Sequence, residues 1–128
     1  MEDCPVVNDS EGWVVALCEV PRRMRRENLS LLNCIRDAEP DLSDVDRATG
    51  AIERHLRRNP ELVDAWQRES DDTRGSPNHY MKDQEVGFCD AGFHDRTTHD
   101  DEVSACADFV CRKAAWVLGR QRIQCATP

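Results

Sequence analysis

An apolar stripe in residues 100–120, DDEVSACADFVCRKAAWVLGR, constrains the fold more than any other feature of this chain. The apolar residues recur at spacings of three and four, which is the period of one face of an α-helix. The acidic residues at the start suit the positive end of a helix dipole, and Gly119 suits a helix end. The sequence therefore predicts a helix over about residues 100–119 that is central to the core. Its apolar face comprises Val103, Cys106, Ala107, Val110, Ala114 and Val117.

A β-hairpin is predicted directly before this helix, over about residues 84–99. The runs QEVGFCD and FHDRTTH contain β-branched and aromatic residues, and Ala91-Gly92 separates them. Such runs around a short glycine-containing segment are typical of two antiparallel strands, with Gly92 at positive φ in the turn. Gly87 lies within the first strand, where a glycine indicates a bulge or close packing. We expect the hairpin to pack on the C-terminal helix.

Three further helices are predicted upstream. Pro21 suits a first helical position, and Pro40 ends the pattern that follows it. Ser43 and Asp46 have the spacing of a capping box at the start of the next helix. Asn59, followed by proline, then stops that helix and caps the third. The predicted ranges are about 21–38, 44–58 and 60–70.

Other segments have weaker patterns. Residues 13–20, WVVALCEV, suit either a buried strand or the start of a helix. Residues 69–80, ESDDTRGSPNHY, have the composition of a loop, and the tail, 120–128, is expected to be frayed. The predicted fold class is therefore α+β. We expect a mainly helical single domain over 1–128, with a small antiparallel β-hairpin or sheet packed on the C-terminal helix.

Composition places this chain among globular proteins of the cytoplasm. No run approaches the roughly 18 apolar residues of a membrane helix, and the acidic first residues, MEDCPVVND, do not resemble a secretory signal. The seven cysteines are an odd number in a chain of 128 residues. Reduced thiols in the cytoplasm are therefore favoured over the disulfide framework of a secreted protein.

The dense cysteines and histidines between positions 89 and 111 raise the alternatives of a zinc site or cysteine catalysis. Their spacing is C-x4-H-x4-H-x6-C-x4-C, whereas structural zinc sites use tighter ligand pairs. Cys106 and Cys111 lie about 140° apart around a helix, and only Cys89 and His94 could meet across the hairpin. We expect Cys106 in the core and Cys111 half-buried. The sequence predicts no catalytic residue, metal or cofactor, and His55 is expected to be a boundary residue.

The formal net charge of -8 argues against nucleic acid as the main ligand and favours a basic protein partner. The basic cluster PRRMRR, at residues 21–26, is the exception in this acidic chain. Four arginines near a helix N-terminus oppose the helix dipole. We expect them to pair internally with the acidic segment at residues 37–46, DAEPDLSDVD, although binding of a partner is the alternative.

Residues 44–118 resemble small bacterial immunity proteins, the cytoplasmic inhibitors encoded beside polymorphic or contact-dependent toxins. The resemblance rests on NPELVDAW, SDDTRGSPNHYM, EVGFCD and ACADFV, in that order. It implies a non-enzymatic inhibitor that occludes the basic surface of a cognate toxin domain, commonly a nuclease. The alternatives are a phage or regulatory inhibitor of other host machinery and, third, a zinc-binding or cysteine-dependent enzyme. The acidic residues that we predict to contact a partner are Glu69, Asp71, Asp72, Asp90 and Asp95.

Overall fold

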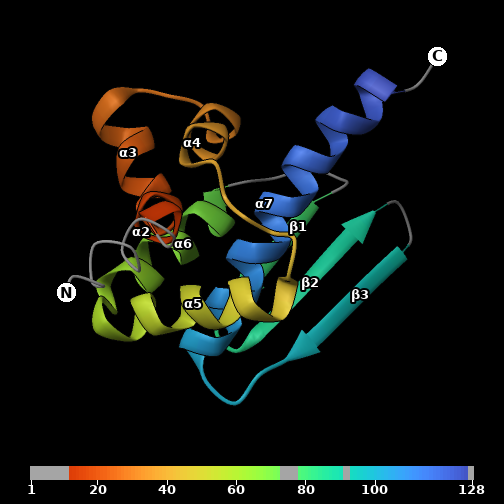
Figure 1. The fold of residues 1–128 in the computed structure, drawn as a ribbon. Helices are drawn as coiled ribbons and strands as arrows, with labels where there is room; N and C mark the ends of the chain where they lie inside the picture. The colour runs from red at the N-terminus through yellow and green to blue at the C-terminus, as the bar shows by residue number, and fades with distance from the viewer. Residues whose placement is uncertain (1–11, 73–77, 91–92, 127–128) are drawn as a thin grey trace.

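The protein is a mainly helical α+β structure, as the sequence predicted (Figure 1). The computed structural model describes residues 12–72, 78–90 and 93–126. In chain order, the elements are α2 Gly12–Cys18, α3 Val20–Glu27, α4 Leu31–Ala38, α5 Val45–Arg58, α6 Glu61–Asp72, β1 Asn78–Lys82, β2 Glu85–Asp90, β3 Phe93–Thr98 and α7 Glu102–Ala126.

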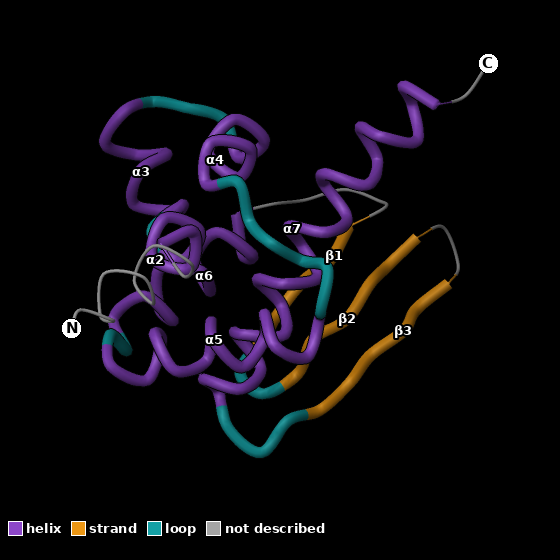
Figure 2. Tube along the Cα trace, in the orientation of Figure 1, coloured by secondary structure: helices purple, strands orange, loops and turns teal. Residues whose placement is uncertain are grey.

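The helices cover one face of a three-stranded antiparallel sheet with the order β1-β2-β3 (Figure 2). The C-terminal helix α7 packs against β1 and β2 on one side and against α5 on the other. Helices α2, α3, α4 and α6 gather on the side of α7 away from β3 (Figure 2). The predicted packing of the strands on the C-terminal helix is therefore confirmed. Within the described residues, no helix combines the length and the apolar character needed to cross a membrane.

Trp66 lies at the centre of the core and connects three helices. Its side chain is fully buried, and its indole Nε1–H donates a hydrogen bond to the carbonyl oxygen of Cys18 in α2 at 3.0 Å. Its ring lies edge-on to Phe109 of α7, with the ring centroids 5.9 Å apart. The indole N–H of a buried tryptophan usually finds a hydrogen-bond partner, and here the ring also gains an aromatic contact.

The helix predicted over residues 21–38 is divided in two, so this prediction is wrong. The first part, α3, ends at Glu27 because Asn28 takes a left-handed conformation with φ of 55°. The next helix, α4, begins after Ser30, whose hydroxyl accepts a hydrogen bond from the backbone N–H of Asn33 at 3.1 Å. Asparagine tolerates this conformation and serine is a favoured N-cap, so two local signals compete with continuation of the helix.

Other predicted boundaries also need correction. The N-cap of α5 is Asp44, which accepts from the Arg47 backbone N–H at 3.2 Å, whereas the Ser43 hydroxyl donates to Asp41. Residues 13–20, left undecided by the sequence, are helical except at Glu19, in α2 and the start of α3. The C-terminal helix continues to Ala126, where we expected a frayed tail from residue 120.

The sheet contains a third strand that the sequence did not predict. We placed residues 78–80 in a loop, but they form β1 and pair with β2, so that Met81 lies opposite Val86. The outer edge of β1 is covered by side chains of α6. The Ser70 hydroxyl accepts from Met81 N and donates to Met81 O, at 2.9 and 3.1 Å, and Gln67 Nε2 donates to the same carbonyl at 2.9 Å. These hydrogen bonds satisfy backbone groups that an edge strand leaves open.

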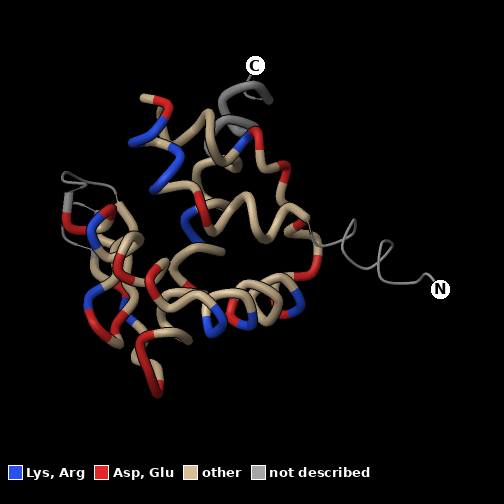
Figure 3. Tube along the Cα trace, turned by 90° about the vertical axis from the view of Figure 1, so that its left-hand side faces the viewer, with Lys and Arg blue, Asp and Glu red and all other residues tan. Residues whose placement is uncertain are grey.

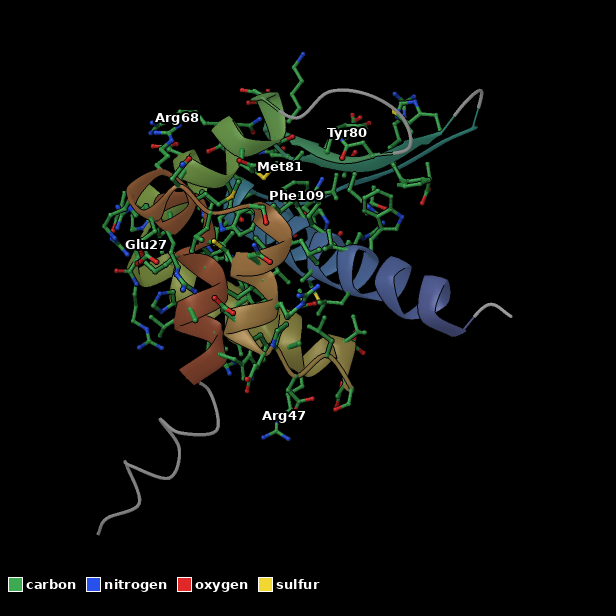
Figure 4. All side chains as sticks on the ribbon, turned by 90° about the horizontal axis from the view of Figure 1, so that it is seen from above. Glu27, Arg47, Arg68, Tyr80, Met81 and Phe109 are labelled. Carbon is green, nitrogen blue, oxygen red and sulfur yellow. The ribbon has the colours of Figure 1, made fainter. Side chains whose placement is uncertain are left out.

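Gly87 is a position of close packing, as its place in the strand predicted. It lies opposite Tyr80 in β1 and Arg96 in β3. A Cβ atom on Gly87 would lie 2.6 Å from the Tyr80 ring and 2.6 Å from the Asp95 carbonyl oxygen. The Tyr80 ring therefore covers the glycine on the sheet face opposite to Phe109 and the helices (Figure 4). The predicted turn at Ala91-Gly92 lies outside the described residues.

We predict that Gly87→Ala lowers the free energy of unfolding by about 1–3 kcal/mol, because the added methyl group overlaps the Tyr80 ring and backbone. The matched control is Gly50→Ala in α5, where a Cβ would meet only the end of the Arg54 side chain, at 3.6 Å. That variant should gain about 0.5–1 kcal/mol from helix propensity. Urea denaturation followed by circular dichroism tests both, and equal effects at the two glycines would contradict the packing argument.

Candidate functional site

The acidic residues predicted to contact a partner do not form one surface among the described residues. Glu69 and Asp71 lie on α6, beside the β1 edge of the sheet, and Asp95 lies on β3, at the other edge. Asp71 accepts a hydrogen bond from Gln67 Nε2 at 3.1 Å, so it is held within its own helix. The side chains of Asp72 and Asp90 lie outside the described part of the structure.

A groove between α5, β3 and α7 is the better candidate for a binding site. Its volume is about 630 Å³, within the range of roughly 300–1,000 Å³ typical of ligand sites. The groove lies where α7, which packs mainly over β1 and β2, is flanked by β3 and α5. Of the acidic residues predicted to contact a partner, none whose side chain the structure describes lines this groove.

One wall of the groove is a stripe of α5. Its lining residues lie three, four and seven positions after Asp46, and they are Thr49, Gly50 and Glu53. Val45, at the rim, is 56% exposed, which is unusual for a large apolar residue in this protein. This wall therefore offers two carboxylates with small and apolar groups between and beside them.

The opposite wall carries a hydrogen-bonded network built on Asp108 of α7. His99 Nε2 lies 2.7 Å from Asp108 Oδ2, and Arg112 Nε donates to Asp108 Oδ1 at 2.6 Å. Arg112 also donates to the Thr97 hydroxyl of β3 at 3.5 Å. Asp108 is 16% exposed, and both of its oxygens are engaged. The network therefore fixes β3 and the residues after it against α7, and it gives the wall a rigid shape.

A second ionic network joins the α5 wall to the start of α7. Arg57 Nη2 donates to Glu53 Oε2 at 2.6 Å and to Asp101 Oδ2 at 3.2 Å. The other carboxylate oxygen of Asp101 accepts from the Ser104 backbone N–H at 2.8 Å, and this hydrogen bond holds the pKa of Asp101 below its usual range. Three carboxylates thus line the groove, Asp46, Glu53 and Asp108, and two of them are paired, Glu53 with Arg57 and Asp108 with Arg112.

An imidazole beside a carboxylate is also the start of an acid–base site, but the thiol in this groove is not activated. Cys111 is 2% exposed, and burial raises its pKa. A nucleophilic cysteine needs the opposite shift. Our expectation of a half-buried Cys111 was wrong, because α5 packs against that flank of α7. Cys106 is fully buried in the core, as predicted.

Cys89 and His94 are direct cross-strand partners in β2 and β3, as the hairpin predicted. His94 Nε2 lies 2.7 Å from the Tyr80 hydroxyl, which donates to Glu85 at 2.5 Å. His99 belongs to the groove instead. Among the described residues, no group of three or more His, Cys, Asp and Glu side chains could hold a metal ion.

Part of the arginine cluster pairs internally, as predicted. Arg23 bridges Glu27 of its own helix and Asp37 of α4, at 3.2 and 3.1 Å. Arg22 lies within 4 Å of Glu19 and Glu61. Of these pairs, the one between Arg23 and Asp37 involves the acidic segment that we expected. In the folded chain, acidic and basic residues lie among one another instead of in separate regions (Figure 3), as ion pairing between them leads one to expect.

His79 occupies an apolar position between α7 and the sheet. Its ring centroid lies 4.6 Å from that of Phe88 and 5.5 Å from that of Trp116, and its buried Nδ1 has no hydrogen-bond partner within the described part of the chain. Burial, and then the charges of Lys113 and Arg112, lower its pKa to about 4. Lys113 itself is 3% exposed and donates to Asn78 Oδ1 at 2.7 Å. A protonated His79 is therefore unfavourable in the folded protein.

We predict that His79→Phe reduces the loss of stability in mild acid. Because the pKa of His79 is lower when folded, wild-type stability is fully present above about pH 6.5 and falls as the pH drops toward 4. This contribution is about 2 kcal/mol, after allowance for the solvent contact that the ring keeps. Thermal denaturation of both proteins from pH 8 to 4.5 measures it. Parallel pH profiles would show that His79 does not carry this dependence.

We predict that Cys89 reacts first with Ellman's reagent in the native protein. Cys18, Cys34, Cys106 and Cys111 are buried, whereas Cys89 is partly exposed. Burial raises the pKa of Cys18 to about 12, so its thiolate is scarce at neutral pH. The measurement uses a chain in which Cys4 and Cys125, whose side chains lie outside the described part of the structure, are replaced by serine. Adding Cys89→Ser should then remove the fast phase, and a fast phase that persists would contradict the burial of the other four thiols.

The geometry thus gives an acidic groove with one rigid wall and no activated thiol. No family model, curated protein or solved structure matches this chain.

Proposed function

We propose that this protein is a non-enzymatic acidic inhibitor that binds and occludes a basic protein partner. The observation that carries the proposal is the groove between α5, β3 and α7, with carboxylates at Asp46, Glu53 and Asp108. Asp46 is exposed at the rim, and Val45 beside it adds apolar surface. Arginine and lysine side chains combine an aliphatic stem with a cationic head, so a groove of this composition suits them.

The charge of the whole chain supports the same partner. A net charge of -8 attracts a basic protein over a distance and accelerates the encounter, whereas it repels nucleic acid. At the groove, short-range contacts would then decide the affinity. Carboxylates already held in place, such as Glu53 by Arg57 and Asp108 by Arg112, lose little side-chain entropy on binding.

The resemblance of residues 44–118 to bacterial immunity proteins identifies the class of partner that we propose. The partner is a cognate toxin domain with a basic, nuclease-like active surface, which the inhibitor covers. Burial raises the pKa of the Cys111 thiol, which disfavours this residue as the nucleophile of a cysteine-dependent enzyme. An inhibitor of other host machinery would use the same kind of contact on a different target.

Co-expression with the product of the neighbouring gene tests the proposed function. We expect the two proteins to purify as a complex and the growth defect caused by the neighbour alone to disappear. A neighbour that is toxic but neither bound nor suppressed would refute the immunity function. A non-toxic neighbour with no complex would favour the alternative, an inhibitor of other machinery.

We predict that the double variant Asp46→Lys/Glu53→Lys weakens that complex at least about tenfold, because it reverses two carboxylates of the groove. The matched control is Asp64→Lys/Glu61→Lys. Each pair contains an exposed acid in the first turn of a helix and an acid paired with an arginine, but the control pair lies on α6, away from the groove. Isothermal titration calorimetry measures the affinities. Equal losses in the two variants would mean that charge alone, and not the groove, determines binding.

A further inference from the structure

Gly50 is a glycine in the middle of α5 that packing within the described residues does not require. Glycine is the least favourable residue in a helix interior after proline. A Cβ atom at this position would meet only Arg54 Nη1, at 3.6 Å, which is an ordinary contact with the end of a flexible side chain. Gly50 lines the groove, so the missing side chain leaves its α5 wall open to close approach by another backbone.

The two walls of the groove have the form of a seat for a helix. The lining residues of α7 are Asp108, Cys111, Arg112 and Ala115, which repeat the spacing of the α5 stripe. Each wall is thus one face of a helix over two turns, with the small residues Thr49 and Gly50 at the centre of the α5 wall and Ala115 at the end of the α7 wall. Two such faces side by side form the type of groove into which an amphipathic helix packs.

Among the residues that the structure describes, the layer of helices over the sheet is incomplete beside β3. Helix α7 packs mainly over β1 and β2. Thr97 of β3 lies opposite the buried Val86 of β2, so it is on the same face of the sheet, and Asp95, two residues before it, shares that face. Asp95 is exposed there, and Thr97 lines the groove. A helix beside α7 would cover this part of β3, as helices cover sheet faces in α+β proteins.

The spacing of the acids favours a helix over an extended segment. Asp46 and Glu53 are seven residues apart in α5, which is about 10.5 Å along the axis. Cationic residues seven apart on a partner helix have the same spacing. Residues on one face of an extended strand repeat every ~6.8 Å, so neither one nor two repeats match the separation of Asp46 and Glu53.

Charge also decides between possible occupants. Residues 1–11 of this chain contain four acidic residues and no basic residue, so the acidic groove repels them. A second copy of the chain carries a net charge of -8 and meets the same repulsion. A basic partner has the charge opposite to that of the groove carboxylates, so it is the occupant that charge favours.

We propose that the groove receives a basic amphipathic helix of the partner, which lies closest to α5 at Gly50 and places two cationic side chains, seven residues apart, on Asp46 and Glu53. This inference rests on the proposed function and adds the secondary structure and the residue spacing of the bound element. It predicts that a side chain that fills the groove blocks binding even when no charge changes.

Two probes test the inference on the full-length protein. The first is a synthetic alanine-based peptide of about 18 residues, long enough for an isolated helix to form in part, with arginines seven positions apart. Its control has the same composition, with the second arginine moved by two residues and so by about 200° around the helix. We expect the first peptide to bind at least about tenfold more tightly than the control. Amide chemical shifts should change in α5 and α7.

The variant Ala115→Leu should weaken binding of the first peptide at least about tenfold, because it fills the groove. Its matched control, Ala16→Leu, also places leucine at an exposed helical alanine, but on α2 and outside the groove. Gly50→Leu should act like Ala115→Leu. Equal binding of the two peptides, or unchanged binding by both groove-filling variants, would overturn the inference.

The second probe, the purified neighbouring gene product, separates this inference from the proposed function. Weaker binding by Ala115→Leu than by Ala16→Leu supports both. If the charge-reversed groove loses affinity for the partner while both groove-filling variants bind like the wild type, the inhibitor function stands and the helix inference fails. If the partner does not bind the wild-type protein, the proposed function fails.

Discussion

The burial of Trp66 is the interaction on which the rest of the structure depends. The indole of α6 donates a hydrogen bond to the backbone of α2 and contacts Phe109 of α7 edge-on, so it fixes three helices that are distant in sequence. Because α7 is positioned by this contact, the sheet that packs on α7 is positioned too. The location of the groove follows from the same contact, since α7 forms one of its walls and supports the strand beside it.

The elements that could be predicted from the sequence are those with a strong local period. The apolar face of α7 recurs at three and four residues, and the buried Cys106 and Val110 follow from it. The β2–β3 hairpin joins two strands that are neighbours in sequence. The close packing at Gly87 depends on the absence of a side chain at that residue. In each case, the residues that allow the prediction belong to the predicted element itself.

The features that the sequence did not reveal depend on contacts between distant segments. The strand β1 has little alternation of its own, and its edge is satisfied by Ser70 and Gln67 of α6. Cys111 is buried because α5 covers a flank that the helical wheel of α7 leaves at the boundary. The groove depends on three segments and on ionic contacts such as that of Arg57 with Asp101, 44 positions apart. The groove therefore has no local sequence motif.

The cover that Ser70 and Gln67 provide for β1 also limits how copies of this protein can associate. A sheet grows into a fibre only when both of its edges accept a further strand. Here the edge at β1 already has hydrogen-bond partners at Met81, so among the described strands only β3 presents an unpaired edge. Strand pairing between copies through this sheet would therefore end at two molecules. The same polar contacts that complete the fold thus act as a stop to open-ended β-assembly.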